Sequence, residues 1–284
     1  REDSPPLAVL RVGSKDQPVL AKKGDDLRID WGHLHAATPL ETSLRRSITS
    51  GPAAREGFVA GRALPGTDDP PGPRAAGGAG PVLAFTFDLG AVGAAPVSRF
   101  VMLAYDDVYS IKYMGQKLKP FWRRQGLDAA ALLAEANASF RSVAERCRTF
   151  DEELLADLEK AGGRKYARIA ALAYRQALAG NKLAADSSGR PLLFPKENFS
   201  NGCIATVDVI YPMAPLFLLL GPDIAKAMLV PVLDYGSSER WRHPFAPHDL
   251  GTYPHATGQV YGGGERTEEN QMPVEESGNL LILA

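Results

Sequence analysis

The sequence predicts a two-part fold, with an N-terminal β region followed by a C-terminal region of paired helices. Short β-rich runs separated by Gly, Pro and Asp fill residues 1–115. From Leu118 onward, apolar residues recur with the 3.6-residue period of helices. In the second half, polar clusters fall repeatedly at the starts of short helices. This placement favours part of a toroid, in which the N-termini of inner helices converge on a cleft.

The β region contains four predicted strands. Several short antiparallel strands favour a β-sandwich, and the sequence leaves open whether that sandwich is complete. Residues 61–81 are rich in Gly, Pro and Ala without periodicity, which predicts a loop. The predicted strands are residues 8–12, 26–30, 81–88 and 97–105.

Trp31, His33 and His35 alternate, which would place both histidines on one face of a strand. An HxH pair could ligate a metal, but no third ligand is evident nearby. We therefore expect packed or solvated histidines at this position.

The middle of the chain predicts helices at residues 128–147, 151–160 and 163–178. Gly180 is a plausible stop for the third helix. One stripe of this third helix is predicted to pack against the core, and it consists of Tyr166, Ile169, Ala170, Ala173 and Ala177.

The last part of the chain predicts a hairpin arm at residues 191–195 and three short helices. Two prolines, Pro212 and Pro215, are expected to fix where the first helix begins, and Asp208 then lies at its N-terminus. The second helix covers residues 222–235. The third begins at residue 273 with two acidic residues in its first turn. The predicted domains are a β-sandwich region at 1–115, a helical linker at 116–162 and the toroid part at 163–284.

Composition excludes several classes of protein. The 284 residues are 45% hydrophobic and 23% charged, which is typical of globular proteins. A net charge of −1 gives no argument for nucleic acid or an anionic membrane as partner. No run approaches the ~20 apolar residues of a membrane span. The two cysteines, Cys147 and Cys203, are expected to be free thiols.

Both ends of the sequence suggest a piece of a larger protein. It begins at Arg1 without methionine or a signal-peptide pattern, so we expect any targeting segment to have been removed or to lie outside it. It ends at residues 280–284 in an apolar helix, which needs neighbours on every side. We expect the missing part of the toroid to pack there and to be required for solubility.

Residues 241–279 are predicted to form one wall of an active site. They include three of the five histidines and many acids, and they lie between two apolar helical segments. A loop of this length inside a compact domain is usually functional.

Three segments resemble the glutaminase A-like family: FSNGCIATVDVIYPMAPLFLLL at 199–220, LDYGSSERWRHPFAPHDLGTYPHATGQ at 233–259 and ENQMPVEESGNLLI at 269–282. The resemblance implies an N-terminal β-sandwich region and an (α/α)6 barrel of the six-hairpin glycosidase type, of which this chain holds the first part. It also implies hydrolysis of the side-chain amide of L-glutamine, usually outside the cell, so the expected location is secreted or periplasmic. The wider superfamily implies glycoside hydrolysis.

The residues themselves support carboxylate chemistry better than acyl-enzyme chemistry. No GxSxG elbow is present, and we expect Cys203 to be a buried structural thiol rather than a nucleophile. Glycoside hydrolysis requires two carboxyl groups on either side of the scissile bond. We therefore expect the catalytic groups among Asp208, Asp249, Glu275 and Glu276.

Aromatic residues with polar tips around these acids favour a pocket for a sugar or a zwitterion. The histidine spacing carries no zinc signature, so no metal or other cofactor is expected, although carboxylates leave calcium binding open. The expected partners are a small-molecule substrate, either glutamine or a glycan, and the rest of the barrel. The residues expected to bind substrate are Trp241, His248, Tyr253, Tyr261, Glu269 and Asn270.

Three functions therefore stay open at the level of the sequence. They are a glutaminase-like amidohydrolase, an inverting glycoside hydrolase that uses a carboxylate pair, and a non-catalytic protein that binds a ligand in the same cleft.

Overall fold

A computed structural model describes residues 2–4, 6–24, 29–70, 72–73, 80–197 and 200–284. The chain divides into two compact units. The first consists of Arg1–Gln17, Asp30–Asp107 and Leu127–Arg141. The second consists of Pro18–Ile29, Val108–Gly126 and Ser142–Ala284.

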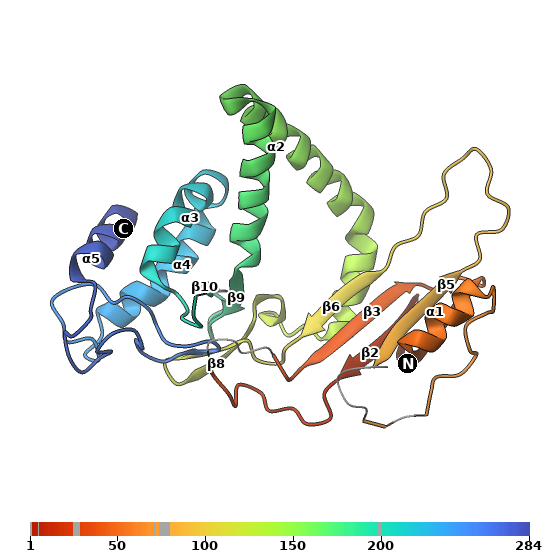
Figure 1. The fold of residues 1–284 in the computed structure, drawn as a ribbon, viewed down its shortest axis with the longest axis horizontal. Helices are drawn as coiled ribbons and strands as arrows, with labels where there is room; N and C mark the ends of the chain where they lie inside the picture. Colours follow the sequence, from red (N-terminus) through yellow and green to blue (C-terminus); the bar gives the residue numbers. More distant parts are fainter. Residues whose placement is uncertain (1, 5, 25–28, 71, 74–79, 198–199) are drawn as a thin grey trace. The chain divides into compact units, whose positions relative to one another are not determined.

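The first unit contains two antiparallel sheets, one short helix and the beginning of a long helix (Figure 1). The four-stranded sheet has the order β1-β2-β3-β6, and β4 pairs with β5 in the two-stranded sheet. Helix α1 (Gly51–Val59) follows β4 directly, with the Ser50 hydroxyl accepting a cap hydrogen bond from the backbone N–H of Ala53. The strands are β1 (Glu2–Ser4), β2 (Leu7–Gly13), β3 (His33–Pro39), β4 (Leu44–Ser50), β5 (Pro81–Phe87) and β6 (Met102–Asp106).

The predicted β region is thus confirmed, while the closed β-sandwich stays a prediction. Strands β2 and β5 match the predicted runs closely. Residues 26–28 of another predicted strand lie outside the described residues, and β3 and β4 carry no clear alternation that would have revealed them. His33 and His35 do lie on one face of β3, with ring centroids 6.5 Å apart.

The predicted strand at residues 97–105 is too long at its start, because β6 begins only at Met102. In the β3–β6 register, Phe100 would lie opposite Pro39, which has no N–H to donate. The Thr38 hydroxyl donates instead to the Phe100 carbonyl at 2.8 Å. The ladder therefore stops before this point.

The second unit begins with a five-stranded sheet of order β10-β9-β8-β7-β11. The predicted arm at residues 191–195 is confirmed as one strand of the antiparallel β9–β10 hairpin. The segment predicted as a helical linker starts with a strand, β8, and a 3-10 turn before its helix. These elements are β7 (Ile111–Tyr113), β8 (Gln116–Pro120), the 3-10 turn (Phe121–Arg123), β9 (Asn181–Ala185), β10 (Pro191–Pro195) and β11 (His255–Ala256).

The three helices predicted in the middle of the chain are one element, α2 (Ala129–Ala179), interrupted only at Gly163. Residues 148–150 contain no Gly or Pro, so nothing ends a helix there. Gly163 has φ 80° and ψ 173°, a conformation that favours glycine. The predicted packing stripe is also wrong at three positions, since Tyr166, Ile169 and Ala173 are exposed while Ala167 is buried. The true stripe is rotated by one residue toward Ala167.

Helices α3 (Val207–Leu220), α4 (Pro222–Gly236) and α5 (Pro273–Leu283) pack beside one another, as Figure 1 shows. Asp208 does lie in the first turn of α3, as predicted. The prediction that Pro212 and Pro215 mark the beginning of this helix is wrong, because both prolines lie inside it. The helix loses two backbone donors there, and burial of its apolar face, which includes Ile210 and Phe217, offsets the loss.

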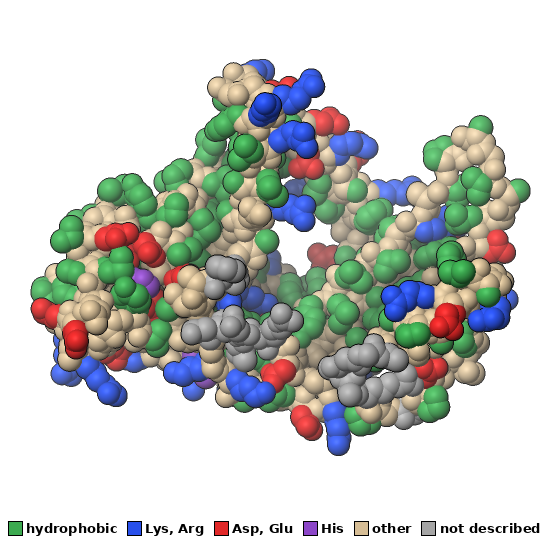
Figure 2. All heavy atoms as spheres, viewed as in Figure 1, with side chains coloured by type: hydrophobic (Ala, Val, Ile, Leu, Met, Phe, Trp, Pro, Cys, Tyr) green, Lys and Arg blue, Asp and Glu red, His purple; other side chains and the backbone are tan. Residues whose placement is uncertain are grey.

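The core of the second unit joins these helices to the sheet and to the long loop between α4 and α5. It includes Phe194 from β10, Ile210 from α3, Met228 from α4 and Leu250 from the loop. Apolar side chains also remain exposed on α3 and α5 (Figure 2), including Leu219 and Leu281. Within the described part of the chain, no helix combines the length and apolar character needed to cross a membrane. The toroid itself stays a prediction.

A glycine in the long loop provides a test of this packing. Gly251 has φ 135°, and a Cβ at this position would lie 2.3 Å from the His255 carbonyl oxygen. We expect Gly251→Ala to lower the free energy of unfolding by about 1–3 kcal/mol, measured by urea denaturation. Gly278, inside α5 with open space around it, is the matched control, and Gly278→Ala should stabilise the protein by about 0.5–1 kcal/mol. Equal effects of the two substitutions would contradict this packing of the loop.

Candidate active site

The candidate site lies where the long loop runs along the segment that precedes α3. Backbone hydrogen bonds join the two segments: Val207 N–H donates to the His248 carbonyl at 2.8 Å, and Leu250 N–H donates to the Ile204 carbonyl at 3.0 Å. This pairing brings His248 to the N-terminus of α3. Because α5 packs on α3, the first turn of α5 reaches the same place.

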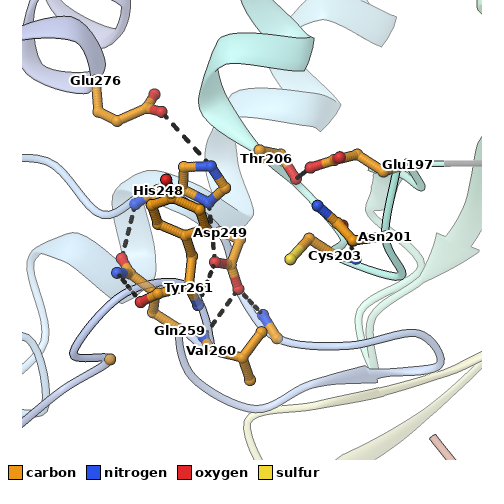
Figure 3. A network of polar contacts seen from close by, with 12 residues as sticks. Glu197, Asn201, Cys203, Thr206, His248, Asp249, Gln259, Val260, Tyr261 and Glu276 are labelled. Atoms are coloured by element: carbon orange, nitrogen blue, oxygen red, sulfur yellow. Dashed lines mark hydrogen bonds and ion pairs between the residues drawn. The ribbon is translucent and has the colours of Figure 1, made fainter. Parts of the chain in front are cut away.

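Asp249 is the most firmly held side chain of the site. It is fully buried, and its Oδ1 accepts hydrogen bonds from the backbone N–H groups of Gly251 and Val260 at 2.7 and 3.1 Å. Its Oδ2 accepts from the N–H of Tyr261 at 3.1 Å and from the His248 ring at 3.0 Å (Figure 3). With all four contacts occupied, Asp249 is suited to orienting His248 rather than to proton transfer with a substrate.

His248 is held on three sides. Its Nδ1 faces Asp249, its ring stacks on Tyr261 with centroids 4.0 Å apart, and its backbone N–H donates to Gln259 Oε1 at 2.7 Å. Burial lowers the pKa of His248, but the hydrogen bond and the charge of Asp249 more than offset this effect. The pKa of His248 therefore lies above its ordinary value. This favours an imidazolium whose Nε2 faces away from Asp249.

Glu276 lies on the Nε2 side of this ring. It is fully buried in the first turn of α5, and its Oε1 is 4.0 Å from His248 Nε2 (Figure 3). Within the described ranges of the chain, neither of its oxygens has a hydrogen-bond partner. Burial raises the pKa of Glu276, Asp208 raises it further, and His248 lowers it. The result is a pKa of about 8, compared with an ordinary 4.5. Glu276 is thus a carboxylic acid at neutral pH.

Asp208 and Glu197 complete the group. The ligand atoms of Glu197, Asp208 and His248 all lie within 4.8 Å of one another. Burial raises the pKa of Asp208, while the positive charge of His248 opposes this rise. Asp208 Oδ1 has no hydrogen-bond partner, whereas both oxygens of Glu197 accept hydroxyl hydrogen bonds, from Thr206 at 2.9 Å and from Ser200 at 2.5 Å.

This arrangement can donate and accept protons in a shielded environment. Glu276 holds a proton at neutral pH, and Asp208 is a carboxylate with strengthened basicity. His248 supplies positive charge from a fixed position. Such a combination of an acid and a base with separated environments is what general acid–base hydrolysis requires.

Cys203 lies close to this group but is not oriented as a nucleophile. Its sulfur is within 4.8 Å of ligand atoms of His248 and Asp249, and the residue is buried. Both ring nitrogens of His248 are directed at carboxylates, at Asp249 and at Glu276, rather than at the sulfur (Figure 3). Both cysteines are thiols, as predicted, with Cys147 exposed.

The structure brings together Asp208, His248, Asp249, Tyr261 and Glu276 from the predicted set. Of the remaining candidates, Glu275, Glu269 and Asn270 are exposed. Glu275 is nevertheless near enough to Asp208 and Glu276 to raise the pKa of both.

The other two predicted binding residues, Trp241 and Tyr253, are buried in the core. The indole N–H of Trp241 donates to the Phe245 carbonyl at 2.5 Å, and its ring contacts Tyr235. Lys196 lies over the Tyr253 ring at 5.6 Å. These contacts give both aromatics a packing role, and their part in substrate binding stays a prediction.

Sequence reasoning did not select Glu197 or Gln259. Glu197 was one acid among many, and its proximity to Asp208 depends on the β10–α3 connection folding back. Gln259 bonds His248 N–H, the Tyr261 carbonyl and Gln271 Oε1, the last at 2.6 Å. The resembling segment 233–259 ends at this glutamine, and that was the only available signal.

The raised pKa of Glu276 predicts a specific dependence of stability on pH. Because the pKa is higher in the folded state than the ordinary 4.5, ionisation of Glu276 costs folding free energy as pH rises from about 4.5 through about 8. We expect Glu276→Gln to remove this part of the slope. Between pH 4.5 and pH 8, the free energy of unfolding of the variant should rise relative to that of the unmodified protein by an amount on the order of a few kcal/mol. Urea denaturation across this range measures it.

Asp223→Asn is the matched control for this substitution, because Asp223 is an exposed acid in the first turn of α4. The control should keep the slope of the unmodified protein. Identical pH slopes for Glu276→Gln and the unmodified protein would show that Glu276 does not titrate abnormally.

Comparison with known proteins bears on the whole chain. A family model described as "Glutaminase A six helical-hairpin domain" matches residues 163–284, and one described as "Domain of unknown function (DUF5127)" matches residues 2–157. The chain is 34% identical over 262 residues to Glutaminase A of Aspergillus oryzae, which covers 90% of this chain and 37% of that protein. It is 32% identical over 167 residues to a probable glutaminase of Arthroderma benhamiae, covering 58% of this chain and 19% of that protein.

The chain thus spans little more than a third of the Aspergillus relative and a smaller part of the other. Within that span, the two family models cover nearly all of its residues, and the resemblance seen in the sequence is confirmed. The chain belongs to the glutaminase A-like family.

Proposed function

We propose that this chain is part of a hydrolase that cleaves the side-chain amide of L-glutamine at the cluster of Asp208, His248 and Glu276. The observation that carries the proposal is the buried Glu276, whose pKa of about 8 makes it a proton donor at neutral pH beside a basic carboxylate. The names of the two relatives, a glutaminase A and a probable glutaminase, support glutamine as the substrate.

The proposed reaction uses a water molecule and two carboxyl groups. Asp208 accepts a proton from water while the water oxygen bonds to the amide carbon, which leaves a tetrahedral oxyanion. Glu276 then donates its proton to the amide nitrogen as the carbon–nitrogen bond breaks. The products are L-glutamate and ammonia, and a proton passes from Asp208 back to Glu276 through solvent to restore the starting state.

His248 and Asp249 act on this reaction through charge. The imidazolium, fixed by Asp249, lies between the acid and the base and stabilises negative charge that develops on the substrate oxygen. These steps use only side chains of this chain, and we propose that no cofactor takes part, with a structural calcium ion as the alternative. We also propose that the protein acts outside the cell, in line with the family resemblance.

A second candidate function is glycoside hydrolysis. It is favoured by the match to a six helical-hairpin domain, together with a carboxyl group that is protonated at neutral pH beside one that is basic. In that reaction Glu276 would protonate the leaving-group oxygen and Asp208 would activate water for inversion.

The two candidate functions can be distinguished by the products that the protein releases. The full-length protein should release ammonia from L-glutamine, and it should release no reducing sugar from a panel of α- and β-linked glycans. The reverse result would favour the glycosidase. If the protein released neither product while it still bound glutamine, the function would be non-catalytic binding.

Replacement of the proton donor is the direct test of the proposed reaction. Glu276→Gln should lower kcat for ammonia release by about 10²–10⁴-fold, because the amide cannot donate a proton to the leaving group. Activity of the unmodified enzyme should fall as pH rises through about 8, where Glu276 ionises. Steady-state ammonia assays at pH 6 to 9 measure both effects.

Asp223→Asn serves again as the control, with unchanged kcat and pH profile expected. Retention of more than half the activity by Glu276→Gln would rule out Glu276 as the proton donor.

A further inference from the structure

The candidate site holds more carboxyl groups than the proposed reaction uses. Besides Asp249, the carboxyl groups of Glu197, Asp208 and Glu276 lie near His248, and Glu275 lies near enough to Asp208 and Glu276 to raise the pKa of both. The imidazolium is already paired with Asp249 at 3.0 Å. Among the residues that the structure describes, no lysine or arginine side chain forms an ion pair with any of the four. Figure 2 shows acidic side chains gathered between α3 and α5, next to a histidine.

A second, independent observation indicates that a ligand belongs here. Among the residues that the structure describes, none forms a hydrogen bond with either oxygen of the fully buried Glu276 or with Oδ1 of Asp208. A buried polar group without a partner costs free energy, so native proteins rarely keep several of them together unless something binds. A bound group with hydrogen-bond donors would satisfy these oxygens.

Glu197 and Glu275 both lie near enough to Asp208 to raise its pKa, and they have no part in the proposed proton transfers. The hydroxyl groups of Ser200 and Thr206 hold Glu197, and its carboxylate lies within 4.8 Å of Asp208. Glu275 is the exposed residue beside Glu276 in the first turn of α5.

We propose that Glu197 and Glu275 bind the α-ammonium group of the substrate, so that the site selects a free amino acid over its N-acylated or desamino analogue. This inference rests on the proposed function, which places L-glutamine in the site. An ammonium group has three donors and no acceptor, which matches a set of carboxylates without basic partners. N-acylation removes this charge, and a desamino analogue lacks the group altogether.

The spacing of the acids also fits an ammonium group. Two oxygens that each accept a hydrogen bond of ~2.8 Å from one tetrahedral nitrogen are about 4.6 Å apart. One ammonium nitrogen can therefore contact both Glu197 and Asp208, whose ligand atoms lie within 4.8 Å of each other.

The test compares three amides with the full-length enzyme: L-glutamine, N-acetyl-L-glutamine and 5-amino-5-oxopentanoate, which has no α-nitrogen. We expect kcat/KM for L-glutamine to exceed that for each of the other two by at least about 10-fold, which corresponds to one lost charged contact. Glu197→Gln should raise KM for L-glutamine by about 10-fold and leave kcat within about 2-fold of the unmodified value. For the desamino amide, kcat/KM should change by less than about 2-fold.

Glu275→Gln should show the same pattern, and Asp223→Asn should change none of these values. Because a carboxamide has nearly the shape of a carboxylate, circular dichroism and the melting temperature should stay unchanged in all three variants. A Glu197→Gln protein that fails to fold leaves Glu275→Gln to decide. Equal kcat/KM for the three amides, or equal losses on all of them in both variants, would overturn the ammonium site and leave the proposed hydrolysis standing.

Calorimetric binding to Glu276→Gln protein separates this inference from the reaction. If the unmodified enzyme released no ammonia from any amide, tighter binding of L-glutamine than of N-acetyl-L-glutamine would still support the ammonium site while the proposed function failed. Equal affinities would reject both. If prior dialysis against EDTA abolished the preference and added Zn²⁺, Mn²⁺ or Ca²⁺ restored it, the cluster would be a metal site and the inference would be wrong.

Discussion

The burial of Glu276 without a hydrogen-bond partner is the constraint on which the site depends. A carboxyl group in such a position is far less costly as the neutral acid than as the anion, and this difference explains its pKa of about 8. The nearby Asp208 strengthens the effect, because two carboxylates this close cannot both ionise easily. Glu276 therefore keeps its proton at neutral pH because of the way it is packed, and an ordinary glutamate side chain is sufficient for this.

The fold supports this constraint through two kinds of attachment. Helix α5 carries Glu276 rigidly against α3, while the long loop is held by backbone hydrogen bonds and by the four contacts of Asp249. The fixed Asp249 in turn orients His248, whose ring Tyr261 covers on one side. The loop thus behaves as a supporting shell for the acids that the helices present, and rigid helices carry the groups proposed to react.

Much of this arrangement could be predicted from the sequence. The change from β to helical periodicity and the acidic first turn of α5 are both confirmed, and the long loop does supply His248 and Asp249. These features depend on residues that are close together in the sequence. Position along a helix placed Asp208 and Glu276 at N-termini, and 3.6-residue geometry separated Glu275 from Glu276, one exposed and one buried.

What the sequence could not provide was the outcome of long-range contacts. Nothing local indicated that Asp249 would be saturated by Gly251, Val260 and Tyr261, which changes it from a candidate acid to an orienting group. Local rules also failed where burial overrode them, as at the prolines inside α3. The importance of Glu197 arose from the fold-back of its segment toward His248, a contact across 51 residues.

The protonation state of Glu276 is the central claim, and infrared difference spectroscopy of the carboxyl groups measures it most directly. A pH titration of unmodified and Glu276→Gln protein, recorded over the carboxylic acid C=O band, isolates this one group. The structure predicts a band that disappears near pH 8 in the unmodified protein and is absent from the variant. A titration in which no carboxyl group retains its proton above pH 6 would contradict the account.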